Sequence, residues 1–295
     1  MKHLLEISQL TKEEIEHCIQ RALYFKNSTT YPVYSDYTVA NLFYENSTRT
    51  RVSFEMAANH LSMPVINLDL KRSSESKGET IEDTLQSLSA MGIQHVVLRH
   101  SENGIQEKMA KAVGDTVRII NAGDGTHAHP SQALLDLMTI IEQKPHLSQL
   151  KIAILGNIKH SRVANSLQCI FKTMGIKELV MIAPKPWQPE TLHYGHATDD
   201  LSRGLADADV VICLRVQKER FSEADSLDLS TYQKEFMLTT EALKGAKADA
   251  MVLHPGPVNR NIEIASDVVD GKQSFILKQV NNGVYTRMAI LESLI

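Results

Sequence analysis

Short runs of apolar and β-branched residues alternate with helix-length segments along nearly the whole chain. Eight of these runs are expected to form strands: residues 39–44, 65–68, 95–99, 117–121, 152–155, 179–183, 210–214 and 250–253. Several are apolar almost throughout, which is typical of parallel strands that helices cover on both faces. The pattern therefore predicts an α/β protein built on parallel sheets.

Helix start and stop signals separate the predicted strands. Thr11 followed by Glu14 predicts a capping box at the start of the first helix. A further helix is expected over about residues 131–143, ended by Lys144-Pro145, because the residue before a proline disfavours helical backbone. Four predicted strands precede this helix and four follow it, so we expect it to join two domains of similar size.

The expected domains are residues 1–130 and residues 131–283. A C-terminal helix over about residues 284–295 is expected to pack back on the first domain. Ligands of open parallel sheets bind outside the carboxyl ends of the strands, and a cleft between two such domains is the usual binding site. We therefore expect the functional site in the interdomain cleft, with each domain a parallel sheet flanked by helices.

The composition agrees with a two-domain globular protein. The chain has 295 residues, and domains usually hold roughly 150 residues each. Hydrophobic residues make up 43% and charged residues 22%, which is ordinary for a protein with a packed core. The net charge of −4 argues against nucleic acid as the main partner.

Targeting and cysteine patterns restrict the cellular setting. No apolar run approaches the roughly 18 residues of a membrane span, and Glu6 interrupts the apolar stretch near the N-terminus. Neither a membrane-spanning segment nor a secretory signal is therefore expected. The three cysteines, Cys18, Cys169 and Cys213, lack the spacing of a disulfide framework or a zinc site. We expect a cytoplasmic protein.

Hydroxyl and guanidinium side chains gather where the first predicted strand ends and a helix begins, in the run Ser47-Thr48-Arg49-Thr50-Arg51. Free N–H groups at a helix N-terminus attract anions, and arginines supply charge-assisted hydrogen bonds that suit phosphate. An ordinary helix cap with solvated arginines fits the same residues. The run is therefore a candidate phosphate site, with that alternative open.

Five further polar segments accompany the ends of predicted strands or the starts of helices: residues 72–80, 121–132, 156–162, 214–220 and 253–257. Lys77 lies in the first, which a solvated surface loop would also explain. His127 and His129 in the second have no carboxylate at metal-ligand spacing, so zinc is not expected. The third lacks the glycine pattern of a dinucleotide site. The fourth supplies arginines that a dicarboxylate would need, although arginines at the end of a strand are often ordinary surface charge.

Taken in this order, the segments resemble the aspartate/ornithine carbamoyltransferase family over essentially the full chain. Residues 47–51 match the family's carbamoyl-phosphate motif, and His129-Pro130-Ser131-Gln132 matches its His-Pro-x-Gln element. Residues 77–80, 215–220 and 254–257 are those of the aspartate branch. The Ser-Met-Gly and His-Cys-Leu-Pro elements of the ornithine branch are missing from the sequence.

The resemblance implies transfer of a carbamoyl group from carbamoyl phosphate to L-aspartate, giving N-carbamoyl-L-aspartate and phosphate in pyrimidine biosynthesis. It implies that no metal or organic cofactor is needed. It also implies a homotrimer with shared active sites, in which a neighbouring subunit supplies Ser73 and Lys77. Regulatory chains or a dihydroorotase are further partners that the family admits, and the sequence does not decide between them.

The resemblance assigns the carbamoyl-phosphate site to Ser47, Thr48, Arg49, Thr50, Arg99, His129, Gln132, Pro255 and Gly256. In this assignment Arg49 meets the phosphate, and Arg99 bridges the phosphate and the carbonyl group. Arg99, Thr50 and His129 polarise the carbamoyl oxygen, while Gln132 and the Pro255 carbonyl hold the carbamoyl nitrogen. The residues implied as catalytic are Arg49, Thr50, Lys77, Arg99, His129 and Gln132.

The resemblance assigns aspartate to Lys77, Arg162, Arg215, Gln217, Gly256 and Pro257. Arg162 would bind the α-carboxylate, and Arg215 with Gln217 would bind the side-chain carboxylate. The resemblance also implies that Glu45 pairs with Arg162 and Arg220 on domain closure, and that the peptide bond before Pro257 is cis. The leaving phosphate would accept the proton of the attacking amine, because no side chain is an obvious general base.

One departure and three alternatives accompany this interpretation. Val258-Asn259-Arg260 follows the double-proline turn, and Asn261 stands where the related bacterial branch usually has glycine. A carbamoyltransferase for another amino acid is one alternative, although a neutral or cationic side chain would not favour Arg215. A catalytically silent scaffold homologue is the second, and the intact arginines speak against it. The third, a nucleotide-binding dehydrogenase, lacks its glycine fingerprint.

Overall fold

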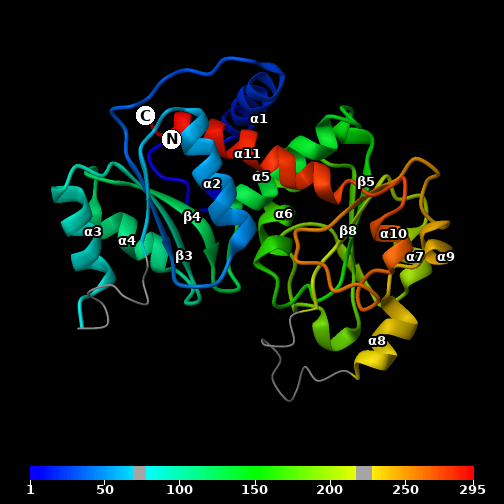
Figure 1. The fold of residues 1–295 in the computed structure, drawn as a ribbon. Coiled ribbons are helices and arrows are strands. Elements are labelled where there is room, and N and C mark those ends of the chain that lie inside the picture. The colour runs from blue at the N-terminus through cyan, green and yellow to red at the C-terminus, as the bar shows by residue number, and fades with distance from the viewer. Residues whose placement is uncertain (69–77, 217–227) are drawn as a thin grey trace. The chain divides into compact units, whose positions relative to one another are not determined.

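The computed structural model describes residues 1–68, 78–216 and 228–295 (Figure 1). The chain divides into two compact units, Met1–Met138 with Val280–Ile295, and Thr139–Gln279. Each unit contains one parallel sheet flanked by helices, as the pattern of apolar runs predicted. In this division the first unit ends at Met138, inside the helix Pro130–Ile141, and also contains Val280–Ile295.

The first unit holds a sheet of β1 (Val39–Phe43), β2 (Val65–Asn67), β3 (His95–His100) and β4 (Arg118–Asp124). The strands pair in parallel in the order β2-β1-β3-β4. From β1 the chain continues to β2 on one side and then crosses to β3 and β4 on the other side. The carboxyl ends of β1 and β3 are the switch point at which these connections diverge.

The helices of the first unit differ in burial, and the helix Pro130–Ile141 is buried on all sides over residues 130–140. They are α1 (Lys12–Asn27), α2 (Thr48–His60), α3 (Ile81–Ala90), α4 (Ile105–Val113), α5 (Pro130–Ile141) and most of α11 (Ile276–Glu292), with a 3-10 turn η1 (Ile7–Gln9). Side chains of α3 and α4 form a core with alternate residues of the strands, such as Ala40 and Leu42. Figure 1 shows α3 and α4 together beside this sheet.

The second unit holds a sheet in the order β7-β6-β5-β8-β9, again parallel throughout. Its strands are β5 (Lys151–Leu155), β6 (Glu178–Ile182), β7 (His196–Thr198), β8 (Val210–Cys213) and β9 (Met251–Leu253). Its helices are α6 (Arg162–Thr173), α7 (Leu201–Leu205), α8 (Leu229–Phe236), α9 (Thr240–Leu243) and α10 (Ser266–Val269), with 3-10 turns η4 (Leu147–Gln149) and η5 (Lys185–Trp187). The switch point of this sheet lies between β5 and β8.

All eight predicted runs overlap strands, but the sequence pattern missed β7. This edge strand has three residues, none of them fully buried, so it carries no apolar run. The predicted helix over residues 131–143 is α5, Pro130–Ile141. The capping box is confirmed, because the Glu14 N–H donates to Thr11 Oγ1 at 3.2 Å and the Thr11 N–H donates to Glu14 Oε2 at 3.0 Å.

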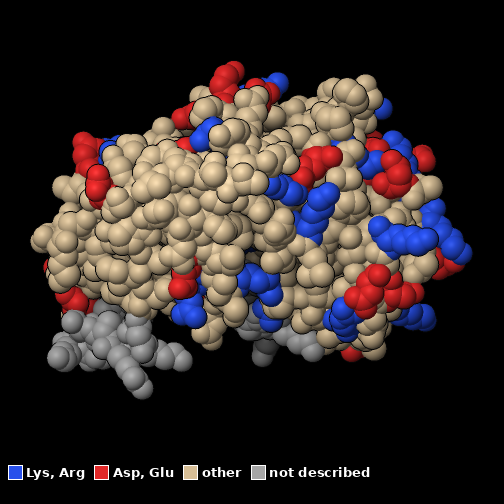
Figure 2. All heavy atoms as spheres, turned by 45° about the horizontal axis from the view of Figure 1, so that its top comes forward, with Lys and Arg blue, Asp and Glu red and all other residues tan. Residues whose placement is uncertain are grey.

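On the face shown in Figure 2, acidic and basic side chains form small mixed groups rather than one large patch of a single sign. Within the described ranges, no helix has both the length and the apolar character needed to cross a membrane. The same ranges contain no group of three His, Cys, Asp or Glu side chains arranged to hold a metal ion.

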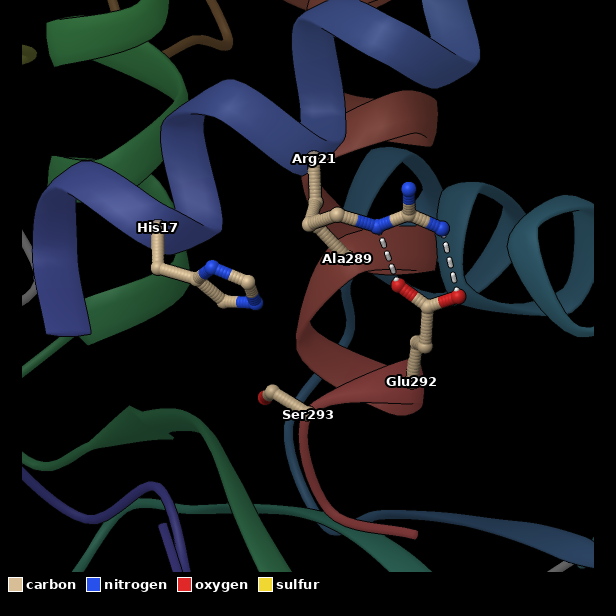
Figure 3. Close-up of a pocket in the computed structure, with 5 residues that line it drawn as sticks. All are labelled: His17, Arg21, Ala289, Glu292 and Ser293. Atoms are coloured by element: carbon tan, nitrogen blue, oxygen red, sulfur yellow. Dashed lines mark hydrogen bonds and ion pairs between the residues drawn. The ribbon is translucent and has the colours of Figure 1, made fainter.

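An ion pair between Arg21 and Glu292 connects α1 to the last turn of α11 (Figure 3). Arg21 donates from Nε and Nη2 to the two carboxylate oxygens of Glu292, at 2.7 Å each. The Tyr34 hydroxyl also donates to Glu292, at 2.8 Å. Arg21 and Glu292 border a surface pocket of about 400 Å³ together with His17, Ala289 and Ser293, and none of these lining residues belongs to the predicted site.

The ion pair generates a stability prediction. Burial raises the pKa of Glu292, but hydrogen bonds from Arg21 and Tyr34 outweigh it, so that the pKa lies below its ordinary value of 4.5. A lowered carboxyl pKa stabilises the fold at neutral pH, and the stabilisation is lost as the pH falls through the folded-state pKa. Replacing Glu292 by Gln is expected to lower the free energy of unfolding by about 1–2 kcal/mol at pH 7, measured by urea denaturation.

The difference between Glu292→Gln and the unmodified protein should shrink as the pH falls through the lowered pKa of Glu292, because the carboxyl group then loses its charge. Glu241→Gln is the control, because Glu241 forms an exposed pair with Lys244, and such pairs contribute less than about 1 kcal/mol. Equal stabilities of the Glu292→Gln variant and the unmodified protein at pH 7 would show that the pair does not stabilise the fold.

Candidate active site

The candidate phosphate-binding residues lie at the switch point of the first sheet. Phe43 at the end of β1 is in register with Arg99 on β3, and the Tyr44 N–H donates to the Arg99 carbonyl at 3.0 Å. The chain then turns into α2, whose N-cap is Ser47. The strand pairing therefore sets Arg99 beside the segment that leads to the helix N-terminus.

The N-terminus of α2 presents hydroxyl groups and backbone amides. Ser47 has extended backbone, and its side chain makes no capping hydrogen bond. By contrast, the Thr80 hydroxyl caps α3 by accepting from the Asp83 N–H at 3.1 Å. Thr50 is buried, whereas Thr48 and Arg49 are exposed. Amides left without a side-chain cap, at the positive end of the helix dipole, favour an anion.

The guanidinium of Arg99 is held by its own unit. Nη1 donates to the Ala122 carbonyl at 3.2 Å, and Nε lies 3.1 Å from a carboxylate oxygen of Glu45. The pairing of β3 with β4 changes register between Leu98 and His100, and such irregularities redirect a side chain at the rim of a sheet. Glu45 thus pairs with Arg99 here, and the expected pairing of Glu45 with Arg162 stays a prediction.

The two histidines before α5 have different environments. His127 Nδ1 lies 2.8 Å from a carboxylate oxygen of Asp124, and this hydrogen bond raises the pKa of His127 despite partial burial. His129 is 5% exposed and immediately precedes α5. His127 therefore stabilises the turn before α5 through its contact with Asp124. His129 lies at the start of α5, near Gln132 in the sequence. The Gln132 Nε2 donates to Asp136 Oδ1 at 2.8 Å.

The second sheet places two arginines at its own switch point. Arg162 is the first residue of α6 and is 5% exposed, and Arg215 follows β8 and is half-buried. The ends of β5 and β8 are joined by the Leu214 N–H, which donates to the Leu155 carbonyl at 2.7 Å. Gly156 has φ +130°, and a Cβ there would lie 2.9 Å from the Leu214 carbonyl oxygen. Glycine is therefore required where the loop after β5 passes β8.

A buried histidine–glutamate pair orders the loop after β9. The Gly256 N–H donates to His254 Nδ1 at 2.8 Å, so the proton of the ring is on Nε2, which donates to Glu263 Oε1 at 3.0 Å. Both side chains are fully buried. Hydrogen bonds at both ring nitrogens hold the imidazole in one orientation and fix the backbone next to Pro255.

The Glu263 carboxylate also binds the chain on either side of the loop. It accepts from the Asn259 N–H at 2.6 Å and, through Oε2, from the Val216 N–H at 3.4 Å. One buried carboxylate thus connects the loop that follows β9 to the residue after Arg215. The sequence analysis missed Glu263. An isolated acid between Ile262 and Ile264 was the signal that could have indicated it.

The backbone after β9 matches the expectation for the double-proline turn. The Gly256–Pro257 peptide bond is cis, which confirms that prediction. Asn261, which replaces the usual glycine, has φ +59°, a region that asparagine tolerates better than most residues. Its Oδ1 accepts from the Ser266 N–H at 3.0 Å. The departure therefore keeps a left-handed backbone and adds a hydrogen bond that glycine could not make.

Four predicted residues lie outside the described part of the chain: Ser73, Lys77, Gln217 and Arg220. The others fall into two sets. The first unit carries Ser47, Thr48, Arg49, Thr50, Arg99, His129 and Gln132, and the second carries Arg162, Arg215, Pro255, Gly256 and Pro257. Each set follows the carboxyl ends of the strands of its own sheet.

Comparison with known proteins covers both units. Residues 2–142 match the aspartate/ornithine carbamoyltransferase carbamoyl-P binding domain, and residues 148–294 match the Asp/Orn binding domain of the same family. The two matches meet close to the end of α5 (Ile141). The family match therefore spans nearly the whole chain and follows its division into two sheets.

Two curated relatives carry the same name. The chain is 65% identical over 295 residues to the aspartate carbamoyltransferase catalytic subunit of Legionella pneumophila (strain Corby), covering 100% of this chain and 99% of that protein. It is 48% identical over 297 residues to the aspartate carbamoyltransferase catalytic subunit of Coxiella burnetii (strain Dugway 5J108-111), covering 98% of this chain and 95% of that protein.

Solved structures match the residues of each unit. The aspartate transcarbamoylase of Trypanosoma cruzi, in complex with carbamoyl aspartate and phosphate, is 28% identical with a TM-score of 0.90, covering 100% of this chain and 96% of that one. The ornithine carbamoyltransferase of Pyrococcus furiosus is also 28% identical, with a TM-score of 0.87, covering 98% and 96%. With both domain matches and these relatives in agreement, the chain belongs to the aspartate/ornithine carbamoyltransferase family.

Proposed function

We propose that the protein transfers the carbamoyl group of carbamoyl phosphate to the amino group of L-aspartate, releasing N-carbamoyl-L-aspartate and phosphate. The observation that carries this proposal is the pair of arginines, Arg162 and Arg215, at the switch point of the second sheet. A substrate with two carboxylates is matched by two guanidinium groups. The names of the curated relatives agree with it.

The first unit supplies the phosphate-binding residues of the proposal. The amides and hydroxyls of Ser47, Thr48 and Thr50 at the start of α2 bind the phosphate group together with the Arg49 guanidinium. Arg99, oriented by the Ala122 carbonyl, reaches from the phosphate to the carbonyl oxygen. Charge accumulates on both groups as the carbon–oxygen bond breaks, so these contacts strengthen in the transition state.

The carbamoyl end of the substrate is bound by polar groups from both units. Thr50, Arg99 and His129 stabilise the carbonyl oxygen as it becomes an oxyanion. The Gln132 side chain and the Pro255 carbonyl accept hydrogen bonds from the carbamoyl nitrogen. Because Pro255 belongs to the second unit, the proposal requires both sets of residues to act on one pair of substrates.

The aspartate carboxylates determine which amino acid is accepted. Arg162 binds the α-carboxylate, and Arg215 with Gln217 binds the side-chain carboxylate, next to Lys77. A cationic side chain such as that of ornithine would be repelled by Arg215. The amine then attacks the carbamoyl carbon, the bond to the phosphate oxygen breaks, and the departing phosphate takes the amine proton. Orientation and charge stabilisation therefore account for catalysis without a protein base.

We also propose a cytoplasmic homotrimer in which Ser73 and Lys77 act in the active site of a neighbouring subunit. The edge strand β2, which the Ser73 and Lys77 segment follows in the sequence, supports an interface here. Ile66 on β2 is 45% exposed, and Val52 and Met56 on α2 are 42% and 45% exposed. Exposed edge strands and apolar side chains mark association surfaces. Light scattering with candidate regulatory chains or a dihydroorotase tests partners beyond the trimer.

Arginine substitutions test the reaction. Arg49→Ala is expected to lower kcat/KM by about 10²–10³-fold, because it removes a cation from the leaving phosphate. Arg215→Ala is expected to raise the KM for aspartate about 100-fold, since a charged hydrogen bond contributes roughly 1.5–3 kcal/mol. A colorimetric assay for carbamoyl aspartate measures both, and Arg203→Ala on α7 is the control with full activity. Unchanged aspartate saturation in Arg215→Ala would refute the aspartate assignment.

A Glu263→Gln substitution tests the order of the loop after β9. The amide of glutamine would set its NH₂ group against a backbone N–H or the His254 Nε2–H, so at least one of the three bonds at this carboxylate is lost. The KM for aspartate is expected to rise about tenfold, while phosphate binding to the first unit, measured by calorimetry, stays unchanged. Glu235→Gln, exposed on α8, is the control. An equal loss of phosphate binding would contradict this role.

Subunit mixing tests the shared site. An Arg49→Ala chain and a Lys77→Ala chain, each nearly inactive alone, are mixed and allowed to reassemble. In a head-to-tail ring of three, random mixing makes roughly three quarters of the rings mixed, and each mixed ring has one intact site out of three. About a quarter of the native activity should therefore return. If mass spectrometry shows exchange of subunits but activity stays at the parental level, Lys77 does not act across the interface.

A further inference from the structure

A buried arginine lies behind the first turn of α5. Arg287 on α11 is 3% exposed, and its Nη1 donates to the Gly283 carbonyl at 3.0 Å. Its Nη2 lies 3.5 Å from the Ser131 hydroxyl at the start of α5. Its guanidinium carbon lies 5.0 Å from the ring centre of Phe54 on α2. One cation therefore contacts the two helices that carry the proposed phosphate and carbamoyl contacts.

A glycine on α11 makes room for the Arg287 guanidinium. Gly283 lies within α11, where a glycine costs about 0.5–1 kcal/mol relative to alanine. A Cβ at Gly283 would lie 2.5 Å from Arg287 Nη1 and 3.5 Å from a methyl carbon of Leu135. Gly283 therefore leaves the space that the Arg287 guanidinium fills. This explains why a residue that destabilises helices occurs within α11.

Asp136 is the acidic counterpart of Arg287. It lies on α5 and is fully buried. Burial lowers the pKa of Arg287 to about 9, and the negative charge of Asp136 opposes this effect. A carboxylate and a guanidinium that are removed from water together keep their charges more readily than either would alone. Asp136 is thus the electrostatic partner of Arg287 in the interior of the first unit.

This carboxylate orients the Gln132 amide. Gln132 Nε2 donates to Asp136 Oδ1 at 2.8 Å. A carboxylate only accepts hydrogen bonds, so the NH₂ group of Gln132 must face Asp136. The two ends of an amide are otherwise distinguished only by their hydrogen-bond partners. The Oε1 atom of Gln132 is therefore the end that remains for a ligand.

We propose that Asp136, balanced by Arg287, is a positioning residue that turns Gln132 Oε1 toward the acyl group, so that the site selects an acyl phosphate bearing an NH₂ group. This inference rests on the proposed function. The carbamoyl NH₂ donates to Oε1, whereas the methyl group of acetyl phosphate would leave that buried acceptor without a hydrogen bond. Sites built to hydrogen-bond a substrate group discriminate strongly against an analogue that lacks it.

Two unreactive analogues separate positioning from general stability. Phosphonoacetamide keeps the NH₂ group, and 2-oxopropylphosphonate carries a methyl group in its place. The unmodified protein is expected to bind the amide at least tenfold more tightly in calorimetry. Asp136→Asn should reduce this ratio to about threefold or less by weakening the amide alone, because the single oxygen of asparagine cannot face both Arg287 and Gln132.

A double-mutant cycle shows whether Asp136 acts through Gln132. Gln132→Ala should reduce the ratio as Asp136→Asn does, and combining the two should reduce it no further. Asp136→Asn/Arg287→Met removes both buried charges, so it provides a folded protein if Asp136→Asn alone is unstable, and it should show the same reduced ratio. Circular dichroism verifies the fold of every variant.

The outcomes separate this inference from the proposed function. Equal weakening of both analogues by Asp136→Asn, or additive effects in the cycle, would overturn the positioning role. An unmodified protein that makes carbamoyl aspartate but binds the two analogues equally would overturn the inference and leave the proposed function standing. Failure to form carbamoyl aspartate would overturn the proposed function itself.

Discussion

Parallel strand pairing is the constraint on which the candidate site depends. In a parallel sheet all carboxyl ends lie along one edge, and where the strand order reverses, the connections leave in opposite directions. That reversal lies between β1 and β3 in the first unit and between β5 and β8 in the second. Arg99 and the N-terminus of α2 occupy the first reversal, and Arg162 and Arg215 occupy the second. The strand order of each sheet thus decides where the proposed substrate-binding arginines lie.

Buried carboxylates then hold the polar groups at these positions. Glu263 accepts from the His254 ring and from the backbone of Asn259 and Val216, so it joins two loops of the second unit. Asp136 accepts from Gln132 in the first unit. A carboxylate inside a protein must be matched by donors, because an unmatched one is strongly unfavourable. The same requirement that keeps these acids paired fixes their partners in one orientation.

The fold does not decide which amino acid is used. An aspartate transcarbamoylase and an ornithine carbamoyltransferase both match this chain at 28% identity and with similar TM-scores. The choice depends on a few side chains on loops that leave a shared scaffold. Arg215 is the described residue that favours an acidic side chain, and the curated relatives at 65% and 48% identity agree with that choice.

The sequence by itself determined the α/β class, eight of the strands, the capping box at Thr11 and the polar segments that identify the family, because apolar periodicity and short motifs are local. It missed β7, whose three residues carry no apolar run. Only the tertiary structure distinguished His127 from His129, and only it showed that Glu263 and Arg287 are buried in hydrogen-bonded clusters. The partners in these clusters are far apart in the sequence, as Ser131 and Arg287 are. A local sequence pattern cannot indicate such contacts, because they form only when the chain folds.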